Sequence, residues 1–293
     1  MRVVLISTYE LGRQPFGLAS PAAWLRRAGA DVACLDLAVD SLDPDLVRAA
    51  GMIALYLPMH TATRMALDLI PQLRAIAPGA LLVAYGLYAP LNEAWLRELG
   101  VAVVLGGECE PDLFALYERV RDGGPQQATQ PERRISTERI AFVAPERDGL
   151  PPLSRYAMLA MPDGTSRLAG YTEATRGCKH TCRHCPVVPI YQGRFRAVPR
   201  HVVLEDIRRQ VAAGAQHITF GDPDFLNGPG HAIPLVEALH AEHPELTYDV
   251  TIKVEHLLRH AEVLPVLRDT GCVFVTSAVE SSSDRVLAIL EKN

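Results

Sequence analysis

Short apolar runs alternate with longer amphipathic segments through the first 120 residues of the chain. Five runs predict strands, and the segments between them predict helices: 2–7, 31–37, 51–58, 80–86 and 101–107. The runs are apolar throughout rather than alternating, which is typical of a parallel sheet covered by helices on both faces. With a closing helix over 110–122, the pattern predicts a doubly wound α/β domain at residues 1–122.

Residues 123–169 have a different character, because they are rich in Pro, Gly and charged residues. This composition predicts a linker, with a short hairpin near 135–145. A second α/β pattern follows at residues 170–293, with predicted strands at 170–175, 215–220, 246–254 and 272–281. Four β/α units predict a partial (β/α) barrel with its chemistry at the carboxyl ends of the strands. Since four units do not close a barrel, we expect a chain truncated at the C-terminus.

Composition excludes several classes of protein. The 293 residues are 48% hydrophobic and 22% charged, with a formal net charge of −5. No basic stripe indicates a nucleic-acid partner, and no apolar run approaches the ~20 residues that span a bilayer. The start of the chain lacks the long apolar stretch of a secretion signal. Three of the six cysteines lie in one cluster, so we expect a reducing, cytoplasmic location rather than a disulfide framework.

The cluster is the segment "TRGCKHTCRHCP", in which Cys178, Cys182 and Cys185 form a C-x3-C-x2-C pattern. One interpretation is structural zinc with His180 or His184 as fourth ligand, although such sites usually combine two separated ligand pairs and no second pair follows. A redox pair made by the last two cysteines is another. The third is an iron–sulfur cluster, in which three thiolates leave one iron open, as a catalytic metal requires.

The same pattern after the first strand of a (β/α) barrel resembles the radical S-adenosylmethionine (SAM) superfamily. In that family the residue before the last cysteine, here His184, is usually aromatic and lies near the SAM adenine. "FGDPDF" (220–225) stands where the family carries a Gly-Gly-Glu-Pro-like stretch, which implies SAM contacts for Gly221, Asp222 and Asp224. "SAVESSSDRVLAILEK" (277–292) resembles a further family segment, which implies SAM contacts for Ser277 and Glu280.

The resemblance implies a [4Fe-4S] cluster held by the three cysteines, which cleaves SAM to a 5′-deoxyadenosyl radical. It also implies an electron donor such as flavodoxin or ferredoxin, and a small-molecule or peptide substrate that stays unknown. Lys253 follows the third strand and either faces the SAM or substrate or caps a helix, whereas His180 is interpreted as an ordinary loop residue. The alternative function is a zinc-stabilised or catalytically inactive scaffold.

The N-terminal half, ending in "LGGECEPDLFAL", resembles the Rossmann-like domain of the cobalamin-binding subgroup of that superfamily. Within it, the chain is similar to a group named for a Cys/Sec-Cys-Ala-Glu-Pro-type C-terminal tail, a motif that the sequence lacks. The Asp-x-His-x-x-Gly signature of a cobalt-ligating histidine is also absent, so any cobalamin would bind without one. Candidate contacts at the carboxyl edge are Gly86, Gly107, Glu108 and His60, the last of which otherwise begins a helix capped by Thr61.

Overall fold

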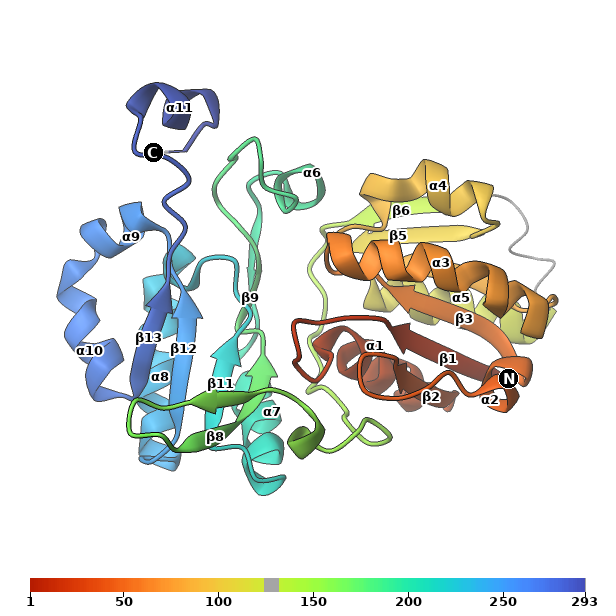
Figure 1. Cartoon of the computed structure of the whole chain (residues 1–293), viewed down its shortest axis with the longest axis horizontal. Coiled ribbons are helices and arrows are strands. Elements are labelled where there is room, and N and C mark those ends of the chain that lie inside the picture. The colour runs from red at the N-terminus through yellow and green to blue at the C-terminus, as the bar shows by residue number, and fades with distance from the viewer. Residues whose placement is uncertain (124–131, 293) are drawn as a thin grey trace. The chain divides into compact units, whose positions relative to one another are not determined.

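The computed structural model describes residues 1–123 and 132–292. The chain divides into two compact units, Met1–Pro151 and Pro152–Asn293. Each unit contains its own sheet with helices packed against it (Figure 1). Among the described residues, no helix has both the length and the apolar content that crossing a membrane would require.

The first unit is a parallel sheet of six strands in the order β2-β1-β3-β4-β5-β6. The predicted doubly wound fold is therefore confirmed, with the reversal of strand order between β1 and β3. In such sheets ligands bind beyond the carboxyl ends of the strands, near that reversal. The strands are β1 Arg2–Ser7, β2 Asp31–Asp36, β3 Ala50–Tyr56, β4 Leu81–Tyr85, β5 Val103–Gly107 and β6 Glu132–Ser136.

Apolar side chains project from both faces of the first sheet, which explains the unbroken apolar runs. Along β1, Val3 and Leu5 pack in one core layer with Leu113, whereas Val4 and Ile6 pack in the other. Successive strand residues point to opposite faces, so both positions must be apolar when helices cover both. The helices of this unit are α1 Phe16–Arg27, α2 Pro44–Arg48, α3 His60–Ile76, α4 Glu93–Glu98 and α5 Glu110–Gly123.

The segment predicted as a linker is largely built into the two units. Residues 132–136 form β6, which pairs in parallel with β5 from Val103 to Gly107, so the hairpin expected near 135–145 does not form. At Gly107 the backbone has φ +71°, and a Cβ there would lie 2.0 Å from the carbonyl oxygen of Ser136. Only glycine permits this close approach of the two strands. Residues 124–131 of the predicted linker lie outside the described part of the chain.

The second unit contains a five-stranded sheet in the order β13-β12-β11-β8-β7. Four strands are parallel and correspond to the four predicted β/α units, while β7 pairs antiparallel with β8. The partial barrel is thus confirmed. Its strands are β7 Met158–Ala160, β8 Ser166–Thr172, β11 His217–Phe220, β12 Thr247–Thr251 and β13 Cys272–Thr276. Its helices are α6 Val188–Tyr191, α7 Arg200–Ala212, α8 Pro229–Glu242, α9 Val254–Arg259, α10 Leu264–Asp269 and α11 Asp284–Ile289.

A separate antiparallel pair carries the cysteine loop. It joins β9, Thr175–Gly177, to β10, Phe195–Ala197, and the patterns above did not predict it. Gly177 has φ +72°, and a Cβ there would lie 2.3 Å from the carbonyl oxygen of Arg194. The glycine directly before Cys178 therefore lets the chain turn out of β9 while the two strands stay in contact.

Candidate iron–sulfur and SAM site

The cysteine loop follows β8 and β9, at the carboxyl edge of the parallel strands of the second unit. Within the loop, the backbone N–H of Cys185 donates to the carbonyl of Cys182 at 3.1 Å. Cys182 is buried, and Cys178 and Cys185 are partly buried. Burial raises the pKa of the Cys178 and Cys185 thiols above the ordinary value of 9.0. These two thiols are protonated at neutral pH, so a bound metal would have to stabilise their thiolates.

Asn227, which the sequence did not single out, supports the start of this loop. It is 2% exposed, and its Oδ1 accepts from the backbone N–H of Lys179 at 3.2 Å. The Sγ of Cys178 lies 3.8 Å from the same oxygen. Asn227 belongs to the segment after β11, so this segment holds the cysteine loop, which follows β8 and β9. An Asn-Gly pair three residues beyond Asp224 predicts only a turn, which is why the role of Asn227 was missed.

Asp222 is bonded within the protein on both carboxylate oxygens. It accepts from the backbone N–H of Ala174 at 3.0 Å and from the hydroxyl of Thr175. Burial raises its pKa to about 7. Beside it, a Cβ on Gly221 would lie 1.8 Å from the Tyr171 hydroxyl oxygen, so the chain approaches that ring closely. These contacts fix the chain between β8 and the cysteine loop.

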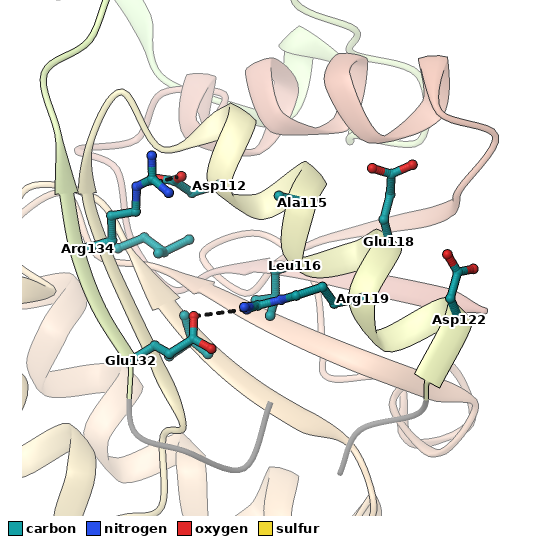
Figure 2. Close-up of a pocket in the computed structure, with 10 residues that line it drawn as sticks. Asp112, Ala115, Leu116, Glu118, Arg119, Asp122, Glu132 and Arg134 are labelled. Atoms are coloured by element: carbon teal, nitrogen blue, oxygen red, sulfur yellow. Dashed lines mark hydrogen bonds and ion pairs between the residues drawn. The ribbon is translucent and has the colours of Figure 1, made fainter. Parts of the chain in front are cut away.

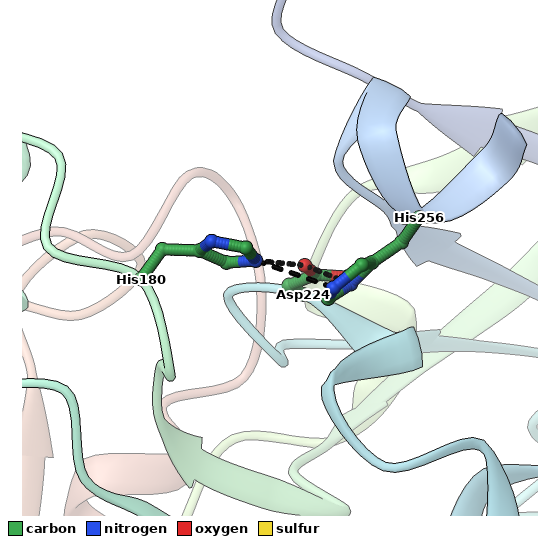
Figure 3. A group of neighbouring side chains, drawn as sticks. All are labelled: His180, Asp224 and His256. Atoms are coloured by element: carbon green, nitrogen blue, oxygen red, sulfur yellow. Dashed lines mark hydrogen bonds and ion pairs between the residues drawn. The ribbon is translucent and has the colours of Figure 1, made fainter. Parts of the chain in front are cut away.

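Asp224 and His180 come together with His256 in one group (Figure 3), and Lys253 contacts His180. Nδ1 of His256 lies 2.7 Å from Oδ2 of Asp224. Nε2 of His180 lies 3.3 Å from Nε2 of His256, and Lys253 Nζ lies 3.1 Å from Nδ1 of His180. Burial raises the pKa of Asp224, although the charge of His256 opposes this, and burial together with Lys253 lowers the pKa of His180. His180 is therefore not the ordinary loop residue that the sequence indicated.

Glu280 joins His184 to the segment after β13. Its Oε1 lies 3.1 Å from Nε2 of His184 and 3.1 Å from Nζ of Lys292. Lys292, which the sequence analysis did not select, is 8% exposed and also donates to the carbonyl of Ala278 at 2.5 Å. These partners, Lys292 first, lower the pKa of Glu280. Ser277 lies in the same segment, and its buried Oγ has no hydrogen-bond partner in the described part of the chain.

The predicted contacts of the first unit lie at the carboxyl ends of its strands. Gly86 follows β4 with φ +104°, and Gly107 ends β5. Glu108 is fully buried, and its backbone N–H donates to Ser136 at 2.8 Å. His60 is exposed and begins α3, but the cap residue is Met59, without a side-chain hydrogen bond, so the predicted cap at Thr61 is wrong. The side chain of a helix cap must precede the first helical residue, and position 61 lies inside the helix.

A cavity of about 560 Å³ in the first unit lies elsewhere, between α5 and the strands β5 and β6 (Figure 2). Arg119 pairs with Glu132 at 2.9 Å, and Arg134 pairs with Asp112 at 2.9 Å. Burial raises the pKa of Asp112 while Arg134 opposes it. The charges that line this cavity are already paired, and none of the predicted contact residues lines it.

Comparison with known proteins agrees with this arrangement. Residues 172–293 match the family model of the radical SAM superfamily. Over these residues the second unit is similar to the radical SAM superfamily. The match begins at the end of β8 and includes the cysteine loop and the carboxyl ends of β11, β12 and β13.

Two curated relatives that match this chain have different names. The hopanoid C-3 methylase of Methylococcus capsulatus is 24% identical over 284 residues, which cover 92% of this chain and 53% of that protein. The tRNA-2-methylthio-N(6)-dimethylallyladenosine synthase of Chloroflexus aurantiacus is 30% identical over 128 residues, which cover 40% of this chain and 26% of that protein. The chain therefore spans only a quarter to about half the length of these relatives.

The fold is also that of a solved structure. The radical SAM methyltransferase TsrM from Kitasatospora setae, solved with tryptophan substrate and the SAM analogue aza-SAM, matches all of this chain with a TM-score of 0.73 and 16% identity. The structure of TsrM with cobalamin and a [4Fe-4S] cluster bound gives a TM-score of 0.74 at 15% identity. The chain covers 61% of TsrM in each case. At this identity the likeness establishes the fold.

Proposed function

We propose that the chain is the cluster- and SAM-binding part of a radical SAM enzyme, in which Cys178, Cys182 and Cys185 hold a [4Fe-4S] cluster. The observation that carries the proposal is the position of three thiols on one loop at the carboxyl edge of a parallel half-barrel. Cys272, the remaining cysteine of this unit, begins β13 and so lies toward the opposite edge. One iron would thus lack a protein thiolate and stay open for SAM.

The donor set fits a cluster better than a single zinc ion. Ligands about 2.3 Å from one tetrahedral ion lie less than 4 Å from one another. Among the described residues, the ligand atoms gathered within 4.8 Å belong to His180, Asp224 and His256, and no cysteine is among them. A cluster of four irons spreads its thiolates farther apart than one ion does. This favours the enzyme over the alternative of a zinc-stabilised scaffold.

The protein's part in the reaction would be to bind, orient and exclude water, while cluster and SAM supply the radical chemistry. We assign SAM contacts to His184, Glu280 and Ser277, because their polar atoms lie in the loops beside the cysteines. Gly221, Asp222, Asp224 and Lys253 complete the proposed contacts. Of these, the Asp222 carboxylate is hydrogen-bonded to the protein, so we expect it to hold the backbone that forms the site rather than to contact SAM directly.

Metal analysis after anaerobic reconstitution of the full chain tests the cluster. We expect about four irons per chain and a brown protein in the wild type, and a loss of most of that iron in Cys182→Ala. Cys272→Ala is the matched control and should keep its iron. One zinc ion and no iron in the reconstituted wild type would establish the scaffold instead.

A SAM-binding titration of the reconstituted chain tests the assigned contacts. Glu280→Gln should weaken binding about tenfold, because it removes the negative charge that strengthens the contacts with His184 and Lys292. Glu291→Gln is the control, since Glu291 pairs with Arg183 on the same loop. Equal SAM affinity of Glu280→Gln and wild type would remove Glu280 from the site.

We further infer that the reaction transfers a methyl or methyl-derived group, and that the first unit binds cobalamin without a histidine ligand. The support is that the matched relatives are named as methylase, methylthio-synthase and methyltransferase, and that TsrM is solved with cobalamin. Candidate contacts are Gly86, Gly107, Glu108 and His60. Absorbance titration with cobalamin should show binding, and His60→Ala should leave the nitrogen splitting in the electron paramagnetic resonance spectrum unchanged. No binding would refute the inference.

A further inference from the structure

Four polar side chains form a continuous chain of contacts beneath the cysteine loop. It runs from Lys253, after β12, through His180 in the cysteine loop and His256 in α9 to Asp224, after β11. Figure 3 shows the last three of these side chains. The three contacts measure 3.1, 3.3 and 2.7 Å in that order. The side chains of Lys253, His256 and Asp224 are each less than a tenth exposed, and that of His180 is 20% exposed.

The donor and acceptor groups of these four side chains fix the direction of the hydrogen bonds between them. A lysine ammonium only donates, so Nδ1 of His180 accepts from Lys253 and the neutral ring carries its proton on Nε2. That proton is donated to Nε2 of His256, which leaves the His256 proton on Nδ1, facing Asp224. This last pair is close but lacks hydrogen-bond alignment, so it acts as an electrostatic contact. Asp224 is itself fixed, because it accepts from the backbone N–H of Leu226 at 3.3 Å.

The same reasoning argues against a metal ion held by His180, Asp224 and His256. A ligating histidine normally donates its other ring N–H to an acceptor. Here the other nitrogen of His180 faces the ammonium of Lys253, so the proton of the ring is on the nitrogen that would have to bind the ion. The lysine also adds a positive charge beside the place an ion would occupy, and it pairs with Glu255 at 2.8 Å.

We propose that Lys253, His256 and Asp224 act through His180 as a latch that positions the loop between Cys178 and Cys182. Lys253 and His256 are positioning residues in this arrangement. His180 lies two residues from each cysteine, so fixing its ring fixes the backbone from which both thiols project. The latch joins the segments after β11 and β12 to the cysteine loop. The proposal rests on the proposed function only where it predicts an effect on a bound cluster.

The first test measures hydrogen–deuterium exchange of the backbone amides at 179–184 in the full chain without metal. His256→Leu should raise exchange about tenfold, as expected for the loss of one buried polar contact worth about 1.4 kcal/mol. His256→Gln should restore exchange to within about twofold of wild type, since its amide both accepts from His180 and donates to Asp224. Lys253→Met removes the other end of the latch and should raise exchange similarly.

The matched control is His260→Leu, the same substitution about one turn along. Its ring contacts His256 at 5.8 Å between centroids but has no contact with His180 among the described interactions. Exchange at 179–184 should not change in this control. Wild-type exchange in both His256→Leu and Lys253→Met would overturn the proposal.

A second readout uses the reconstituted chain and the rate at which a chelator removes iron. His256→Leu should lose iron about tenfold faster than wild type, and His256→Gln at nearly the wild-type rate. Wild type that binds no iron would refute the proposed function, while the exchange experiment still decides the latch. A stoichiometric metal ion that persists in the Cys178→Ala/Cys182→Ala/Cys185→Ala variant and disappears with His256→Leu would overturn the latch in favour of a metal site.

Discussion

Replacing Asp222 by asparagine should remove a large part of the pH dependence of stability in the second unit. The carboxyl group is 2% exposed, and burial raises its pKa from 3.8 to about 7. A group whose pKa is higher in the folded than in the unfolded state binds its proton more tightly when folded. Its stabilising effect is complete below pH 3.8 and is lost as the pH rises through 7.

The magnitude follows from these two pKa values. One pKa unit corresponds to 1.36 kcal/mol, so the contribution of Asp222 should fall by about 2.5 kcal/mol between pH 5 and pH 8. Asparagine keeps an acceptor for the N–H of Ala174 but does not titrate. Relative to wild type, Asp222→Asn should therefore gain about 2.5 kcal/mol of stability across this range.

The assay is urea unfolding of the full chain without metal at pH 5, 6, 7 and 8, which gives the free energy of unfolding of each variant. Taking the difference between wild type and variant cancels the titration of the other groups. Asp269→Asn is the control, because this exposed carboxylate has a lowered pKa beside Arg268 and stays ionised throughout. A difference between wild type and Asp222→Asn that does not change with pH would refute the reasoning.

Three further substitutions test the packing, each by urea unfolding of the full chain. Gly107→Ala should lower the free energy of unfolding by about 3 kcal/mol, because its Cβ would collide with the neighbouring β6 backbone at positive φ. Gly79→Ala should be nearly neutral, since a Cβ there would have nothing within 4 Å, and equal losses in the two variants would contradict this reasoning. His217→Leu should lower the free energy of unfolding by about 3 kcal/mol, because it leaves Asp249 buried without the ring nitrogen now 2.8 Å away. Replacing both side chains should recover part of that loss. Arg97→Met should cost about 1–2 kcal/mol, since the guanidinium donates to backbone carbonyls of three residues that precede or belong to β5 and β6; a neutral result would show that these bonds are not needed.

The sequence determined the two folds because their physical cause is local. Strands covered by helices on both faces must be apolar at every position, so runs such as 2–7 identify parallel strands without any structure. The presence of three thiols on one loop is likewise set by chain order alone, although their spacing left zinc, a redox pair and an iron–sulfur cluster open. The order of the β/α units then placed that loop at the reactive edge.

The tertiary structure decided which side chains meet there. His180 is adjacent in sequence to cluster residues but acquires its partners from positions 253 and 256, more than 70 residues away. Lys292 pairs with Glu280 only because the chain turns back after α11. β6 was hidden in a polar segment, since an edge strand needs few apolar residues and is specified by pairing with β5. Chain order fixes which loops reach the edge of the sheet, whereas contacts between those loops depend on distances that no local pattern encodes.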